Sequence, residues 1–173
     1  GLIDTVNVNL AAGTNYATLE AGADARTLNI TGAGNLYLST DDLLTSINAT
    51  AAAGNLNITI TGASEAVVKG GAGNDTLILG TTLTNSDSFD GGSGADTITA
   101  TVGGFNRTFN TQNVETATIT FTDSGELANS STTNITTYNV SAGSAGVAAT
   151  ITQIVDGATI NLTNDGLGIV ALD

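Results

Sequence analysis

Two short glycine-rich segments carry the residues best suited to binding a metal ion. They read GGAGNDTLI (70–78) and GGSGADTIT (91–99), with glycine at the first, second and fourth positions and aspartate at the sixth. Carboxylates and backbone carbonyls are hard oxygen donors, which are the ligands that Ca²⁺ takes in proteins. In both segments the aspartate is followed by threonine and β-branched or leucine residues, so each predicts a tight turn that leads into a strand.

The spacing within each turn predicts which oxygens act together. In a nearly extended turn successive residues face opposite sides, so the second, fourth and sixth positions form one set of donors. Asp90 adds a carboxylate immediately before the second turn. We therefore expect Ca²⁺ to lie between the two turns, and the predicted ligands are Gly71, Gly73, Asp75, Asp90, Gly92, Gly94 and Asp96.

Both segments resemble the GGxGxDxUx nonapeptide of RTX proteins, which form calcium-binding β-rolls. The match departs from that family in one respect, because Gly70 and Gly91 are 21 residues apart where two nonapeptides would span about 18. We place the additional residues in TTLTNSDSF (81–89), on the opposite edge of the coil. The alternative interpretation is a pair of ordinary Gly-Asp turns without metal. Asn35 and Asn55 stand near the aspartate position of two earlier turns, and as neutral amides they favour metal-free turns there.

Repetition along the chain predicts the fold. Glycine-rich turns recur around Gly34, Gly54, Gly73 and Gly94, at intervals of 19 to 21 residues. Weaker turns lie between them, so each coil adds one strand to each of two parallel sheets, and only stacked coils bury a core. Alternating residues predict strands at 5–10, 26–31, 35–39, 56–61, 66–69, 76–79, 97–102, 114–122, 136–141, 148–153, 158–163 and 168–172.

The predicted fold class is therefore all-β, a right-handed parallel β-roll or β-helix with short glycine-rich turns. One short helix is predicted at 41–49, because Ser39 and Asp42 resemble a capping box and Leu44 and Ile47 fall on one helical face. We expect residues 1–173 to be a single fragment of a larger protein. RTX-like coils occupy 1–104, and coils with degenerate turns continue over 105–173.

The composition excludes several classes of function. Sixteen acidic residues against three basic ones give a net charge of −13, which disfavours binding to nucleic acid and to anionic lipid. Direct membrane insertion is not expected, because no long apolar run occurs. The chain has no Cys and no His, so thiolate and imidazole metal sites are not available. The scattered bases Arg26, Lys69 and Arg107 favour a protein that is not an enzyme.

The threonine-, asparagine- and alanine-rich coils resemble bacterial surface-layer (S-layer) proteins exported by type I secretion. This resemblance implies an extracellular structural protein of the cell surface that folds with calcium and self-associates in a lattice. Two alternatives remain: a segment of a secreted adhesin or biofilm-matrix protein, and the calcium-binding tail of a secreted hydrolase. A cell-surface glycan would be bound through other parts of the parent protein. Five aromatic residues are expected to pack rather than to bind ligands: Tyr16, Tyr37, Phe105, Phe109 and Phe121.

Overall fold

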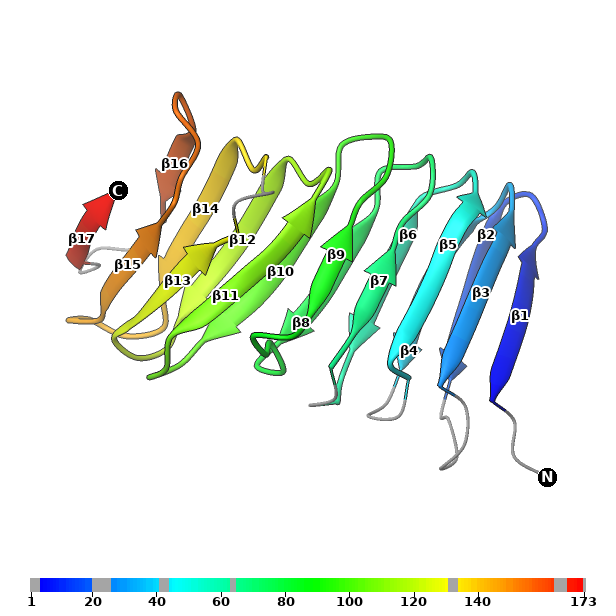
Figure 1. Cartoon of the computed structure of the whole chain (residues 1–173), viewed down its shortest axis with the longest axis horizontal. Coiled ribbons are helices and arrows are strands. Elements are labelled where there is room, and N and C mark those ends of the chain that lie inside the picture. Colours follow the sequence, from blue (N-terminus) through cyan, green and yellow to red (C-terminus); the bar gives the residue numbers. More distant parts are fainter. Residues whose placement is uncertain are drawn as a thin grey trace.

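The chain coils into two stacked parallel sheets (Figure 1). The computed structural model describes residues 4–19, 26–40, 44–62, 65–130, 134–163 and 168–172, with side chains up to residue 163. The odd-numbered strands form one sheet: β1 (Thr5–Leu10), β3 (Thr27–Gly32), β5 (Ser46–Ala52), β7 (Val67–Lys69), β9 (Ser88–Asp90), β11 (Arg107–Gln112), β13 (Gly125–Asn129), β15 (Ala148–Thr152) and β17 (Gly168–Leu172). The even-numbered strands form the other: β2 (Thr14–Leu19), β4 (Asn35–Thr40), β6 (Leu56–Ile60), β8 (Thr76–Gly80), β10 (Thr97–Val102), β12 (Thr116–Phe121), β14 (Thr137–Ala142) and β16 (Thr159–Leu162).

Each strand pairs in parallel with the strand two places along the chain. Thr97 of β10 lies opposite Thr116 of β12, and the register holds to the end of both strands. The next coil repeats it, because Thr116 lies opposite Thr137 of β14. Strands after residue 105 therefore extend the same two sheets as those before it. The predicted parallel β-solenoid is confirmed.

The core lies between the two sheets and is built from columns of inward side chains. Along β10 burial alternates strictly, with every second residue buried. Register carries this pattern from coil to coil, so that Leu77, Ile98, Ala117 and Tyr138 form one buried column. A single coil would leave such a column open to solvent, and only its neighbours cover it. Phe109 and Phe121 are buried in this core as expected.

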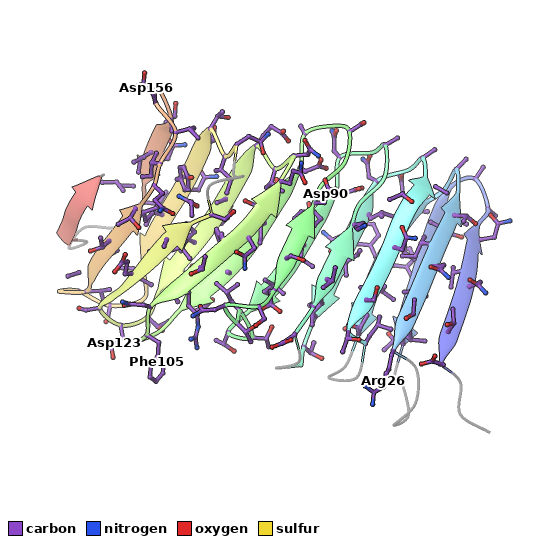
Figure 2. The ribbon with its side chains drawn as sticks, viewed as in Figure 1. Arg26, Asp90, Phe105, Asp123 and Asp156 are labelled. Carbon is purple, nitrogen blue, oxygen red and sulfur yellow. The ribbon has the colours of Figure 1, made fainter. Side chains whose placement is uncertain are left out.

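The turns gather along two edges of the solenoid. The turns that follow odd-numbered strands share one edge, which we call the glycine edge; it includes 33–34, 53–55, 70–75 and 91–96 (Figure 1). The turns that follow even-numbered strands share the opposite edge, where residues 81–87 connect β8 to β9. Figure 2 shows Asp90 at the glycine edge and Arg26, Phe105 and Asp123 at the opposite one. The additional residues in 81–89 thus lie on the edge that the sequence predicts.

The helix predicted at 41–49 is wrong. Residues 41–43 lie outside the described residues, and Ser46–Ala52 forms strand β5, which pairs with β3 and β7. Leu44 is buried in the connection before the strand, while Ile47 and Ala49 point inward from the strand itself. Leu44 and Ile47 are thus both buried at a spacing of three residues, as in a helix, although one precedes the strand and the other lies within it. Parallel neighbours on both sides outweigh the local helical pattern.

Several strands had not been predicted, namely β2, β5, β9, β11 and β13. The described residues contain no helix long and apolar enough to cross a bilayer.

Candidate metal site

The glycines of the predicted site let successive turns of the glycine edge approach closely. A Cβ on Gly73 would lie 2.5 Å from the carbonyl oxygen of Gly54, and one on Gly94 would lie 2.2 Å from that of Gly73. Gly54, Gly73 and Gly94 thus stack on one another from coil to coil, and only a residue without a Cβ fits each of these positions. Gly92 and Gly94 also have φ values of 93° and 137°, which side-chain-bearing residues rarely adopt.

The two predicted turns lie directly on one another. The amide of Ser93 donates a hydrogen bond of 2.9 Å to the carbonyl of Gly71. The carbonyl oxygens of Gly71 and Gly73 both face the second turn, since the backbone of Gly92 and of Gly94 lies against them. The structure therefore brings the two turns together and directs these carbonyls to one side, as the alternation in the sequence predicts.

Asp75 is buried and its carboxylate is turned towards the preceding coil. Its Oδ1 accepts a hydrogen bond of 2.9 Å from the Leu56 amide, and its Oδ2 accepts one of 2.8 Å from the Gly71 amide. Burial raises the pKa of Asp75, and these two hydrogen bonds lower it in part. In this arrangement both carboxylate oxygens are occupied by backbone donors.

Asp96 faces the first turn and keeps one oxygen without a partner. Its Oδ1 accepts a short hydrogen bond of 2.6 Å from the Asp75 amide. Its Oδ2 is buried and makes no hydrogen bond, and the residue is only 1% exposed. The pKa of Asp96 is raised to about 6, mainly by burial. The bond from the Asp75 amide lowers this pKa, and the negative charges of Asp75, Glu115 and Asp90 also raise it. A buried carboxylate with an unsatisfied oxygen is costly unless a cation or donor compensates it.

Glu115 continues this row of acids on the next coil. Its Oε2 accepts a hydrogen bond of 2.7 Å from the Asp96 amide, just as Asp96 accepts one from Asp75. We call Asp75, Asp96 and Glu115 the acid column; each immediately precedes the first residue of its strand. Glu115 was not predicted, although a signal exists: DTLI, DTIT and ETAT all place an acid before threonine at the start of a strand.

Asp90 ends strand β9, immediately before the second turn, and its carboxylate bonds to the following coil. Its Oδ1 accepts a hydrogen bond of 2.8 Å from the side-chain amide of Asn113. The predicted ligands thus divide into two groups. The Gly71 and Gly73 carbonyls face the second turn, and Asp96 reaches the first turn through its Oδ1 while its free Oδ2 lies near Gly91 of its own turn. By contrast, Asp75 bonds to the preceding coil and to its own turn, and Asp90 bonds to the following coil.

A column of asparagines runs beside the acids. Asn35 accepts from the Asn55 amide, Asn55 from the Asn74 amide and Asn74 from the Ala95 amide, each at 2.9 Å. Asn35 and Asn55 therefore align with Asn74 rather than with Asp75. The acid position of the preceding coil holds Leu56, because Asn57 pairs with Thr76. The acid column begins at Asp75.

The oxygen donors that the two turns carry fit a hard cation in kind. They include carbonyl oxygens and one buried carboxylate oxygen without a partner, and the charges that act on Asp96 are all carboxylates. Within the described ranges no group of three or more acidic, histidine or cysteine side chains is placed to hold a metal. A cation here would consequently take most of its ligands from backbone carbonyls, which Ca²⁺ accepts.

No protein-family model, curated protein or solved structure matches the chain.

Proposed function

We propose that the chain is a structural segment of a bacterial surface-layer protein, folded outside the cell and stabilised by calcium at the glycine edge. The observation that carries this proposal is the buried Asp96 carboxylate, which has an unpartnered oxygen and three acidic neighbours. Such a group destabilises the fold unless positive charge reaches it. Calcium supplies that charge, and we assign it to Asp96 with the carbonyls of Gly71 and Gly73.

The solenoid supports a structural role through its repetition. Each coil contacts mainly its neighbours, so the chain makes a long, narrow element whose length grows with the number of coils. Ions between coils would strengthen the contacts on which such an element depends. Extracellular calcium sites typically bind at about 10⁻⁴ to 10⁻³ M, so the low calcium inside a cell would leave the chain less stable until export. We propose no catalytic role.

Thermal unfolding followed by circular dichroism tests the stabilising role. With calcium at about 100 times the dissociation constant, linkage predicts roughly 2.7 kcal/mol of stabilisation. For a domain of this size this corresponds to a rise of about 5–10 °C in Tm relative to metal-free buffer. Magnesium serves as the matched control, because it keeps its waters and demands octahedral geometry. Equal unfolding curves in calcium, magnesium and metal-free buffer would refute the proposal.

Assembly requires a separate test. Electron microscopy of the intact parent protein on its cells, with and without calcium, should show an ordered layer only with calcium. A parent that is dispersed in both conditions would contradict the lattice role while leaving calcium-stabilised folding intact.

A further inference from the structure

Two exposed tyrosines on the even-numbered sheet form a feature that the fold does not require. Tyr16 of β2 is 77% exposed and Tyr37 of β4 is 49% exposed, so both lie outside the core, although we expected them to pack. Their rings stack with centroids 5.2 Å apart and planes at 15°. They lie opposite one another in adjacent strands on the outer face of the sheet.

The register shows that other coils fill this column with small polar residues. Tyr37 pairs with Asn57, and the column continues through Thr76 and Thr97 to Thr116 and beyond. Threonine is a good strand residue and exposes a hydroxyl, so it suits an outer position of this kind. Replacing it by two large aromatic rings exposes apolar surface to water, which favours a role in binding.

Shallow hollows flank the Tyr37 ring. One of about 340 Å³ is lined by both tyrosines together with Ser39, Asn57 and Thr59. A second of about 220 Å³ lies between Tyr37, Asn57 and the asparagine column. Because Asn57 is much shorter than tyrosine, the Tyr37 ring face turned away from Tyr16 is not covered by a third ring.

The lining of both hollows contains only uncharged side chains, although the chain carries a net charge of −13. It combines an open aromatic face with amides and hydroxyls that can donate and accept hydrogen bonds. A sugar ring presents the complementary surfaces, an apolar face of C–H groups and a rim of hydroxyls. An anionic polymer would be repelled by the overall charge.

We propose that Tyr16, Tyr37 and the amides beside them bind a neutral oligosaccharide. The sugar ring stacks on the open face of Tyr37, and Asn57 and Thr59 hydrogen-bond its hydroxyls. This site lies within the chain itself and does not depend on calcium at the glycine edge. It would let a surface segment hold a neutral glycan of a cell wall or matrix.

Amide-resolved NMR titration tests the proposal, with maltohexaose and cellohexaose as neutral probes and oligogalacturonate as the anionic one. At least one neutral probe should shift the amides of β2, β4 and β6, and oligogalacturonate should not. Replacing Tyr37 by threonine, the residue that other coils carry in this column, should weaken binding about tenfold or more. Tyr37→Phe should retain most of the affinity because it keeps the ring face.

Phe105→Ala provides the matched control. Phe105 is 67% exposed on the opposite edge, so this substitution also removes an exposed ring but should leave binding unchanged. Unchanged circular dichroism of the Tyr37→Thr variant shows that loss of binding is not loss of fold. The proposal is overturned if neither neutral probe binds, if only the anionic probe binds, or if Tyr37→Thr binds as well as the parent chain. Dimerisation through the tyrosines, seen by sedimentation and abolished by Tyr37→Thr, would also overturn it.

Discussion

Replacing Asp96 by asparagine should change the stability of the calcium-free chain in a pH-dependent way. The pKa of Asp96 rises from 3.8 to about 6 in the folded state, mainly because the carboxyl is buried. The folded chain therefore binds more protons at Asp96 than the unfolded chain does between these two pH values. Stability from this group is fully present below about pH 3.8 and is lost as pH rises through about 6.

The size of the effect follows from the same shift. A change of about two pKa units corresponds to roughly 3 kcal/mol between the protonated and charged forms. This pKa shift translates into stability with little screening by solvent, because the Asp96 side chain is only 1% exposed. In Asp96→Asn the amide oxygen can still accept from the Asp75 amide, and the neutral side chain removes the charge. We expect the variant to gain up to about 3 kcal/mol over the parent chain at pH 8 and little at pH 4.

Urea unfolding at a series of pH values, in buffer freed of calcium with a chelating resin, measures this difference. Asp123→Asn is the matched control, because Asp123 is an exposed turn carboxylate on the opposite edge. It should show no such pH-dependent gain. In calcium at pH 8 the parent chain should be the more stable of the two, since Asp96→Asn lacks the carboxylate oxygen assigned to the ion. An Asp96→Asn variant that is less stable than the parent at pH 8 without calcium, or equally stable at every pH, would refute the reasoning.

Three further predictions concern the scaffold. Gly73→Ala places a Cβ 2.5 Å from the Gly54 carbonyl oxygen and should lower the free energy of unfolding in denaturant by about 3 kcal/mol or more. Gly80→Ala has open space around it, so it should cost only about 1–2 kcal/mol, the strain of a side chain at a φ of 52°. Asp87→Ala should cost about 2–5 kcal/mol, because the buried Asp87 carboxylate accepts from the Ala66 and Thr84 amides and both would lose their partner; a cost below 1 kcal/mol would show that water replaces it. Ile119→Ala, at a fully buried position, should lower the unfolding free energy by about 2–5 kcal/mol, while Val67→Ala at a 43% exposed position should lower it far less. Similar losses for these last two variants would contradict the assigned core.

The sequence was most informative where each coil repeats its own pattern. Turns around Gly34, Gly54, Gly73 and Gly94 recur at intervals of 19 to 21 residues, which is the length of one coil with two strands and two turns. The two-sheet solenoid could therefore be predicted from them. Strands such as β10 follow from strict alternation. By contrast, β13 reads GELAN and β9 has only three residues, so neither carries a local strand signal. Their parallel neighbours hold them in place, and that register is not visible in a local window.

The sequence could predict that the two turns lie together, but not where each donor oxygen points. The two turns do lie together, and the glycines serve the close approach. The sequence could not show that the Asp75 carboxylate is taken up by the Leu56 and Gly71 amides while Asp96 keeps a free oxygen. This difference depends on how successive coils stack. Glu115 could have been found from its place before Thr116, had the acid been compared at the strand start rather than within the glycine motif.

Diffraction from crystals grown in millimolar calcium, with data collected for the anomalous signal of the ion, tests the central claim most directly. We predict one strong peak between the turns at 70–75 and 91–96, about 2.3–2.6 Å from Asp96 Oδ2. The same turns stacked with no peak between them, and with Asp96 Oδ2 contacted only by protein or water, would contradict calcium as the stabilising ion of this fold.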